Sequence, residues 1–440
     1  MMHTRLRAAA TSLLLILLVA AGFRVAMTWQ YIHRNPKQAL AVIPFLFESG
    51  NIAKSLASGE GFGSPLRVPS GPTAWMTPVY PEMLAAVLRT FGTYTFPSYV
   101  AAVGLNILFS VLTCIPIFYA GKRIGGLGIG AAAAWLWAIF PNAILLTFES
   151  LWDASLDALL AALILWATLA VADSRRKRAF CAYALLWGLA VMTNASLASL
   201  LPFLLGWIAY RQWKLRGAWL WRTALAVAII VLCCVPWTIR NSRTFHAWVP
   251  LRSVMGLQLW LGNNPRTTPI WLGRQHPIFD LAERQKYLQM GEIGYMREKL
   301  RLGLAYMGAH PARVAALSFR RFLAVWSGGT SYPLSDLFRS HSAWFRWVLL
   351  FNIFAALGAL LGIIALWRSR SIYLLPLAAF PLIFPWPYYL TLVEPRYRLP
   401  IDPVVLLLAA LAVRALISPP HSPGKPAVAP VGRASAAPPG

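Results

Sequence analysis

Carboxylates are scarce in this chain, and their distribution suggests where chemistry takes place. The 440 residues include only 14 Asp and Glu. Charge and hydropathy place all of them except Asp173 in outer segments or at the outer ends of membrane spans, whereas Asp173 adjoins the basic run 175–178. Because the acids gather on one side of a membrane, we predict that this side carries the chemistry.

Glu48 is the first candidate among these acids. It opens the segment 47–58, whose pattern predicts a short surface helix that ends at Gly59. Glu48 shares one face of that helix with Ile52 and Leu56. We therefore expect burial to raise the pKa of Glu48, which suits a proton acceptor at neutral pH. The alternative is an ordinary acid at a helix start, favoured by the helix dipole.

Asp153 and Asp157 are the second candidate, at the outer start of a predicted span. They stand one helical turn apart, so both carboxylates face the same way. Ionised groups inside a span are costly and usually face a polar cavity, which makes both residues candidates for catalysis. A helix cap over 150–153 is the alternative for Asp153, but Asp157 lies too deep for that role.

Two arginines depart from the rule that basic residues avoid short outer loops. Arg396 and Arg398 lie in the segment 394–400, EPRYRLP, at the outer start of the last span. Arginine binds phosphate through paired hydrogen bonds, so we predict that both bind a lipid phosphate. Ion pairing with Glu394 or Asp402 is the alternative.

Further phosphate-binding candidates lie in the second outer segment. An amphipathic helix is predicted over 282–306, a break at Pro311, and a second helix over 312–326 that carries Arg320 and Arg321. These helices are candidates to cap an outward cavity. A solvated, charged helix surface is the alternative.

Aromatic residues accompany the candidate acids and arginines. Trp75 and Tyr80 lie in the rigid stretch 71–82, which leads into a second surface helix from Pro81. We predict that these two residues and Tyr397 line the substrate cavity. Anchoring at the membrane–water interface is the alternative for Trp75 and Tyr80.

Composition requires a membrane protein, because 58% of the residues are hydrophobic. We predict an all-α, polytopic fold with about ten transmembrane helices and surface helices in the first outer loop, each span needing roughly 17 to 25 residues. The predicted spans begin near Ala8, Tyr99, Ile129, Ala154, Ala179, Leu197, Leu220, Trp347, Ile372 and Ile401.

Basic clusters on alternate connections orient these spans. They place both termini in the cytoplasm, the multispan domain over 1–418, and the outer loops over about 28–97 and 240–346. The segment 1–21 also fits a cleaved signal peptide. The Pro/Ala-rich stretch 419–440 predicts a disordered cytoplasmic tail.

The net charge of +26 has two sources. Part of it is the orientation signal on inner loops, so we predict no nucleic-acid partner. The outer loop 240–346 adds fifteen Lys and Arg against five acids, which fits contact with anionic membrane lipids or with a phosphate-bearing substrate.

Cysteine and histidine give no sign of a disulfide or of a zinc site. The four cysteines lie inside predicted spans, and the seven histidines lack the paired spacing of zinc ligands. The sequence therefore assigns no cofactor, and it neither indicates nor excludes a divalent metal ion.

Four stretches make the chain resemble the GT-C glycosyltransferase superfamily, in the branch of protein O-mannosyltransferases and aminoarabinose transferases. They are 48–62, 77–81 (TPVYP), 236–241 (PWTIRN) and 394–400. The resemblance implies a polyprenyl-phosphate-linked sugar donor and an acidic base in the first outer loop. Family members often carry Asp or an Asp-Glu pair there, whereas Ser49 follows Glu48 here.

Residues and resemblance together predict a glycosyltransferase of the bacterial inner membrane. A sugar would pass at the outer, periplasmic face to a lipid, glycan or protein acceptor, with Glu48 as the base. Asp153 and Asp157 would bind sugar hydroxyls or assist the base. A transporter or flippase for a lipid-linked sugar is the alternative, although we find no convincing internal repeat of the kind that transporters carry. A noncatalytic membrane scaffold is a third reading, in which none of the outer acids matters.

Overall fold

The computed structural model describes residues 10–36, 43–149, 151–215, 217–268, 273, 275–330, 332–339 and 342–417. The predicted tail, the first residues of the predicted signal peptide and Ser150 of the predicted cap lie outside these ranges. The described part of the chain is almost entirely helical, and its only extended pairing is the bridge between Gly63 and Pro72.

The helices follow one another with short connections, apart from the two long segments predicted to be outer loops. In chain order they are α2 (Leu13–Arg34), η1 (Ile43–Phe45), α4 (Glu48–Ala57), α5 (Val79–Phe91), α6 (Phe96–Leu112), α7 (Cys114–Gly125), α8 (Leu127–Ala138), α9 (Pro141–Leu145), α10 (Ala154–Ala172), α11 (Lys177–Thr193), η2 (Ala195–Leu200), α12 (Leu201–Lys214), α13 (Trp219–Phe245), α14 (Met255–Gly262), α15 (Leu281–Ala309), α16 (Pro311–Ser327), α17 (Pro333–Arg339), α18 (Ala343–Arg368), α19 (Leu374–Ile383), α20 (Trp386–Leu390), η3 (Pro395–Tyr397), η4 (Leu399–Ile401) and α21 (Asp402–Ile417).

Six stretches of the described chain are long and apolar enough to cross a membrane. They are Leu13–Arg34, Phe96–Gly125, Ala154–Ala172, Trp219–Phe245, Ala343–Arg368 and Pro395–Ile417. The other four predicted spans correspond to the shorter helices α8, α11, α12 and the pair α19 and α20. The fold class is therefore confirmed as an all-α, multi-helix membrane protein, and the number of spans stays a prediction.

The predicted surface helices are present, and their ends follow from local sequence. α4 spans Glu48–Ala57 and gives way to Gly59, whose φ of 83° is easy for glycine. α6 begins with a capping box, in which the Thr95 and Ser98 side chains each accept from the other's backbone N–H. His310 separates α15 from α16, whose first residue is Pro311, as proline at a helix start predicts.

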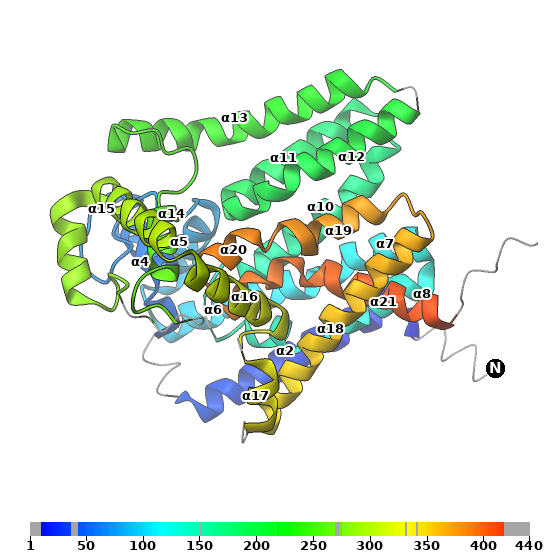
Figure 1. The fold of residues 1–440 in the computed structure, drawn as a ribbon, viewed down its shortest axis with the longest axis horizontal. Coiled ribbons are helices and arrows are strands. Elements are labelled where there is room, and N and C mark those ends of the chain that lie inside the picture. Colours follow the sequence, from blue (N-terminus) through cyan, green and yellow to red (C-terminus); the bar gives the residue numbers. More distant parts are fainter. Residues whose placement is uncertain are drawn as a thin grey trace, which may run out of the picture.

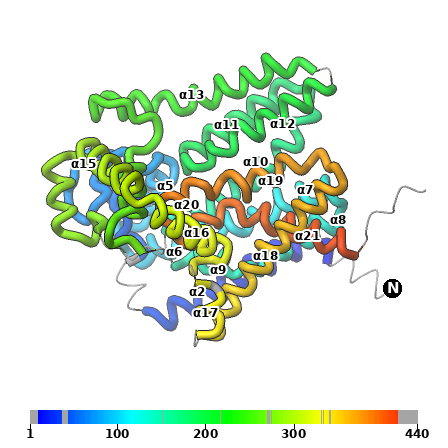
Figure 2. The backbone as a smooth tube through the Cα atoms, in the orientation of Figure 1, coloured from blue at the N-terminus to red at the C-terminus, as the bar shows by residue number. Residues whose placement is uncertain are grey.

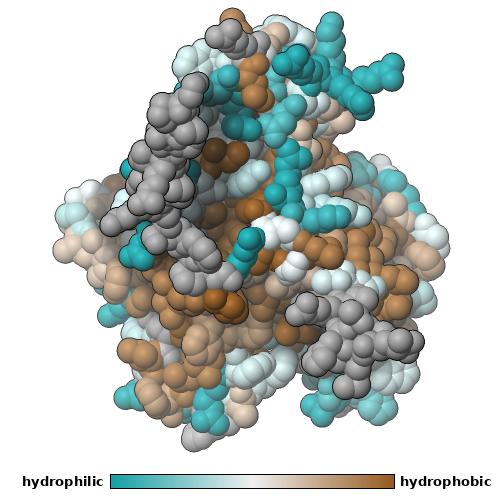
Figure 3. Space-filling view, turned by 90° about the vertical axis from the view of Figure 1, so that its right-hand side faces the viewer, coloured by the Kyte–Doolittle hydropathy of each residue, from teal (hydrophilic) through white to brown (hydrophobic). Residues whose placement is uncertain are grey.

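Four elements of the two long segments gather at one end of the molecule. Figures 1 and 2 show α4, α5, α14 and α15 together at that end, while the connections α7–α8, α10–α11, α12–α13 and α18–α19 lie at the other. Figure 3 looks onto this second end, where hydrophilic side chains stand among apolar surface. With 19 residues and a rise of about 1.5 Å per residue, α10 runs between the two ends.

Asp173 lies at the second end, far from the other candidate acids. It follows α10 directly and pairs with Arg123 at 2.7 Å and with Arg211 at 2.8 Å. Both arginines come from neighbouring helices, α7 and α12. Asp173, the single acid predicted on the inner side, thus joins three helices, and these ion pairs give it a structural role.

Arg24 is fully buried in α2 and joins that helix to α6 and α8. Its guanidinium donates to Ser110 Oγ at 2.8 Å, to Ala138 O at 2.9 Å and to Trp137 O at 3.3 Å. The two carbonyls belong to the last turn of α8, where helical donors run out. Trp137 O also accepts from the backbone N–H of Phe140 at 3.2 Å, so Ala138 O is the carbonyl that depends on Arg24.

Replacing Arg24 with Met should therefore destabilise the protein. The substitution leaves Ala138 O, at the end of α8, without its donor, and an unsatisfied buried group costs about 1–3 kcal/mol. We expect a lower thermal unfolding temperature in detergent for Arg24→Met. Arg34→Met, at the exposed end of the same helix, is the control and should leave the unfolding temperature unchanged. Equal unfolding of both variants would contradict this assignment.

Candidate active site

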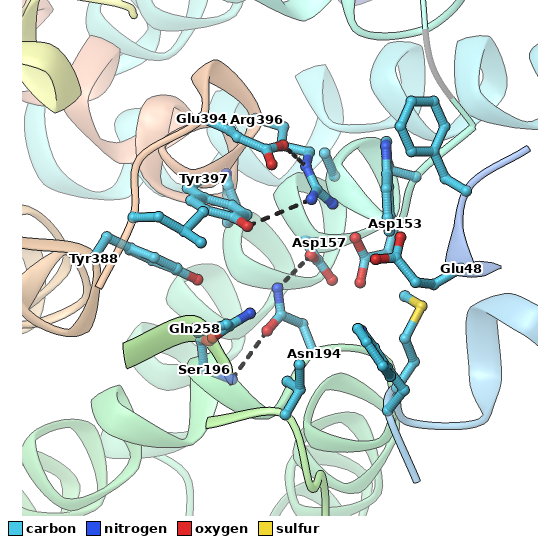
Figure 4. Close-up of a pocket in the computed structure, with 18 of the residues that line it drawn as sticks. Glu48, Asp153, Asp157, Asn194, Ser196, Gln258, Tyr388, Glu394, Arg396 and Tyr397 are labelled. Carbon is cyan, nitrogen blue, oxygen red and sulfur yellow. Dashed lines mark hydrogen bonds and ion pairs between the residues drawn. The ribbon is translucent and has the colours of Figure 1, made fainter. Parts of the chain in front are cut away.

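A cavity of about 360 Å³ opens where the two long segments meet the first turn of α10. Its walls come from the start of α4, the segment after Thr73, the start of α10, the turn before η2, the start of α14, and the segment 388–400. Figure 4 shows acidic, amide, hydroxyl and guanidinium groups pointing into this space. Segments distant in sequence thus supply one polar pocket.

Glu48 reaches this cavity because α4 is held against two neighbours. Ser49 donates its hydroxyl to Leu151 O at 2.9 Å, which fixes the start of α4 beside the start of α10. At Gly50 any Cβ would overlap the carbonyl of Phe45, so only glycine allows this close approach. The residues that follow Glu48 therefore place its carboxylate, which is only 7% exposed.

His276 lies directly against Glu48, with Nε2 3.2 Å from Glu48 Oε1. The Nδ1 atom of His276 accepts from the backbone N–H of Ile278 at 3.3 Å, so Nε2 carries the hydrogen that faces the carboxylate. Burial acts to raise the pKa of Glu48, but the hydrogen bond and electrostatic effect of His276, a backbone hydrogen bond and the charge of Arg396 together more than offset it. The net pKa of Glu48 lies below its ordinary value, so the expected upward shift was wrong.

Asp153 and Asp157 face the same cavity from the first turn of α10. Asp153 directly precedes α10 and its side chain makes no capping hydrogen bond, while Ser150 of the predicted cap lies outside the described residues. Burial raises the pKa of Asp153, and the nearby charges of Arg396 and Arg252 offset only part of that effect. Figure 4 shows the Asp153 and Glu48 carboxylates pointing toward one another.

Asp157 is held by an amide from a different helix connection. Asn194 Nδ2 donates to Asp157 Oδ2 at 2.7 Å, while Asn194 Oδ1 accepts from the backbone N–H of Ser196 at 2.9 Å. The other oxygen, Asp157 Oδ1, is buried and has no hydrogen-bond partner among the described residues. A buried acceptor without a partner is costly, so this oxygen is poised for a ligand.

Two arginines line the cavity in different ways. Arg396 pairs with Glu394 at 2.5 Å and lies over the Trp152 ring, its Cζ 3.6 Å from the ring centroid. Arg252 uses Nε to donate to Trp75 O at 2.9 Å. In the described part of the chain no carboxylate lies within ion-pair distance of Arg252, so its positive charge is available to a ligand.

The motif 236–241 supports the cavity from outside. Arg240 donates to Thr73 O and to Phe62 O, at 2.6 and 2.7 Å, and so holds two turns of the first long segment. Trp237 donates to Leu251 O at 2.8 Å, next to Arg252. This stretch therefore connects the end of α13 to both long segments.

Four of the predicted site residues do not line the cavity. Tyr80 is buried and donates to Asn106 Oδ1 at 3.1 Å, within the packing of α5 on α6. Arg398 is 2% exposed and pairs with Asp402 at 2.6 Å. The structure therefore shows the ion pairing that was the alternative to phosphate binding for this residue.

Arg320 and Arg321 are the other two. Arg321 is fully buried and donates to the carbonyls of Gly262 and Tyr389, which joins α16 to α14 and α20. Arg320 is exposed and donates to the Tyr332 hydroxyl at 3.0 Å. In both cases the guanidinium group donates to other groups of the protein and does not face the cavity.

The remaining predicted residues, Trp75, Arg396 and Tyr397, do line the cavity with the three acids. Sequence reasoning missed His276, Arg252, Asn194, Gln258 and Tyr388, which line it as well. Only Asn194 carried a signal, since it is a polar residue between two apolar stretches. Within the described ranges no group of three or more His, Cys, Asp and Glu is arranged to hold a metal ion.

Comparison with known proteins gives a result only at the level of structure. No protein-family model matches the chain, and no curated protein matches it. Oligosaccharyltransferase AglB from Archaeoglobus fulgidus, in complex with an inhibitory peptide and a dolichol-phosphate, aligns with a TM-score of 0.52 and 13% identity. The alignment covers 92% of this chain and 50% of AglB.

Two further structures align with the chain. The Archaeoglobus fulgidus oligosaccharyltransferase in complex with Zn and sulfate gives a TM-score of 0.50 at 12% identity, over 91% of this chain and 49% of that one. ArnT from Cupriavidus metallidurans, bound to undecaprenyl phosphate, gives 0.36 at 14% identity, over 88% and 78%.

The chain thus spans about half the length of the oligosaccharyltransferases that it matches, 49% and 50%. Its fold is similar to that of these oligosaccharyltransferases, in agreement with the fold that the resemblance to the GT-C superfamily implied. The narrower branch stays a prediction.

The contact between His276 and Glu48 predicts a change in the titration of Glu48. In His276→Leu the hydrogen bond is lost while burial remains, so the pKa of Glu48 should rise from its position below the ordinary value. Glu48 would then take up its proton at a higher pH. An infrared titration of the protonated carboxyl band, taken as a difference against Glu48→Gln, measures this shift.

His310→Ala is the matched control, because His310 is exposed and stacks on Tyr306. It should leave the Glu48 titration unchanged. An unchanged titration in His276→Leu would show that His276 does not set the pKa of Glu48.

Proposed function

We propose that this protein is a glycosyltransferase that moves a sugar from a polyprenyl-phosphate donor to an acceptor at the outer, periplasmic face of the inner membrane. The observation that carries the proposal is a single cavity, in a GT-C fold, that joins the carboxylates of Glu48 and Asp153 to the guanidinium groups of Arg252 and Arg396. Carboxylates suit proton transfer from an acceptor, and guanidinium groups suit a phosphate leaving group.

Glu48 is the proposed base. Its pKa lies below the ordinary value, so Glu48 is ionised at neutral pH and ready to take a proton. The acceptor hydroxyl or amine would lose its proton to Glu48 as its oxygen or nitrogen bonds to the anomeric carbon. The bond between that carbon and the phosphate oxygen breaks in the same step. His276 keeps Glu48 oriented through its Nε2 hydrogen.

Arg252 and Arg396 are the proposed ligands of the phosphate. Negative charge builds on the lipid phosphate as its bond to the sugar breaks, and positive groups fixed in a partly dry cavity stabilise that charge. Arg252 replaces Arg398, Arg320 and Arg321 in this role, because these three donate to protein groups away from the cavity. The AglB structure with a dolichol-phosphate supports a lipid phosphate as the ligand class.

Asp157 and Asn194 are proposed to hold the sugar. The free Asp157 Oδ1 faces the cavity, and Tyr388 and Tyr397, whose rings stack at 4.6 Å between centroids, line the same space. A sugar hydroxyl both donates and accepts, so it can satisfy the oxygen that the protein leaves without a partner.

Glu48→Gln should lose most of the transfer activity. A general base contributes roughly 10²- to 10⁴-fold in rate, and the amide cannot take the acceptor's proton. Transfer of radiolabelled sugar from polyprenyl-phosphate donors to envelope acceptors, with purified protein in nanodiscs, measures the change in kcat. Glu60→Gln, an exposed acid of the same segment, should retain full activity. Full activity in Glu48→Gln would remove Glu48 from the base role.

Replacing either cavity arginine with Ala should weaken binding of undecaprenyl phosphate. A hydrogen bond between charged groups is worth about 1.5–3 kcal/mol, which corresponds to roughly 10- to 150-fold in Kd. Microscale thermophoresis of Arg252→Ala and Arg396→Ala measures the loss. Arg320→Ala, which removes an exposed guanidinium, should bind like the original protein. A loss of equal size in all three variants would indicate nonspecific attraction.

A further inference from the structure

Glu292 is a buried carboxylate that lies outside the cavity, and no sequence pattern assigned it a role. It belongs to α15 and is 6% exposed. Its Oε1 atom accepts from the backbone N–H of Ala74 and from Ser253 Oγ, both at 2.7 Å. Its Oε2 atom accepts from the Tyr287 hydroxyl at 2.8 Å and from the Thr73 hydroxyl. One carboxylate thus binds donors from three segments.

Two of these segments continue directly into the cavity wall. Ala74 precedes Trp75, and Ser253 follows Arg252; both Trp75 and Arg252 line the cavity. The segments are also joined to each other, since Ser253 N–H donates to Ala74 O at 2.9 Å and Arg252 Nε donates to Trp75 O at 2.9 Å. Glu292 therefore closes a network whose far side is the Arg252 guanidinium.

Gly291 gives Glu292 the direction that this network needs. Its φ of 68° and ψ of 165° interrupt the helical geometry of α15, and only glycine adopts such a backbone easily. No atom lies within 4 Å of a Cβ placed at this position. The glycine is thus required by backbone conformation and not by space, one residue before the carboxylate that binds both segments.

We propose that Glu292 is a positioning residue, which fixes Arg252 in the orientation that binds the donor phosphate. The proposal rests on the glycosyltransferase function given above and deepens it. Glu292 does not touch the cavity, so its effect on phosphate must pass through Ser253 and the Thr73–Trp75 backbone to Arg252. This hydrogen-bond network keeps the Arg252 guanidinium directed into the cavity, even though no carboxylate among the described residues pairs with it.

Glu292→Ala should weaken binding of undecaprenyl phosphate by about tenfold, since four donors then lose a buried acceptor and Arg252 is no longer fixed. Glu298→Ala is the matched control. It removes the same charge from the same helix, and no side-chain hydrogen bond to Glu298 is found within the described residues. Its Kd should equal that of the original protein. A normal Kd for Glu292→Ala would overturn the proposal.

A double-mutant cycle separates positioning from a general structural role. In an Arg252→Ala background the further change Glu292→Ala should alter the Kd by less than about twofold, because the group through which Glu292 acts is already absent. A full tenfold loss in that background would overturn the proposal. If Glu292→Ala does not fold, Ser253→Ala removes one of the four donors, and its smaller loss should disappear in the same background.

Hydrogen exchange tests the network without reference to function. In Glu292→Ala the amides of 73–76 and 252–254 should exchange faster, while Glu298→Ala leaves them unchanged. Unchanged exchange in Glu292→Ala would overturn the positioning role. If the original protein bound no polyprenyl phosphate at all, the proposed function would fail, and the exchange result would still decide whether Glu292 holds both segments.

Discussion

Charge that is removed from water must find a partner, and this constraint organises the whole structure. An apolar chain that spans a membrane has little water with which to solvate ionised groups, so each buried charge is costly unless it is hydrogen-bonded. Arg24 reaches the carbonyl end of α8, Arg398 pairs with Asp402, and Glu292 accepts four hydrogen bonds. These contacts hold together helices that apolar packing alone would not fix in register.

The same constraint marks the candidate active site, because there the partnering is incomplete. Asp157 keeps one buried oxygen without a partner, and no carboxylate among the described residues lies within ion-pair distance of Arg252. Other buried charged groups, such as Arg398 and Asp402, also keep single atoms without a partner, but they pair with each other, whereas Asp157 and Arg252 line one cavity. Their convergence indicates a place for a ligand with hydroxyls and negative charge. Glu48 differs, since His276 stabilises its ionised form and so keeps it ready to accept a proton.

Local sequence predicted those features of the candidate site that depend only on a residue and on the helix to which it belongs. The helix that begins at Glu48, the shared direction of Asp153 and Asp157, and the break at Pro311 follow from spacing and backbone preference within a few residues. The pKa of Glu48 did not follow, because its sign depends on His276, which lies 228 residues further along the chain (276 − 48). The role predicted for Arg321 did not follow for the same reason, since its guanidinium donates to carbonyls 59 and 68 residues away in the chain.

The sequence by itself determined the class: 58% hydrophobic residues and repeated apolar stretches require helices in a membrane, and four short stretches indicated the GT-C fold. The tertiary structure alone decided which charges meet. Arg252 and His276 carry no pattern of their own, because a side chain in an irregular segment is aimed by contacts across the fold. Whether an acid or an arginine is paired or free is a property of the packed molecule, and it is this property that separates the cavity residues from their structural counterparts.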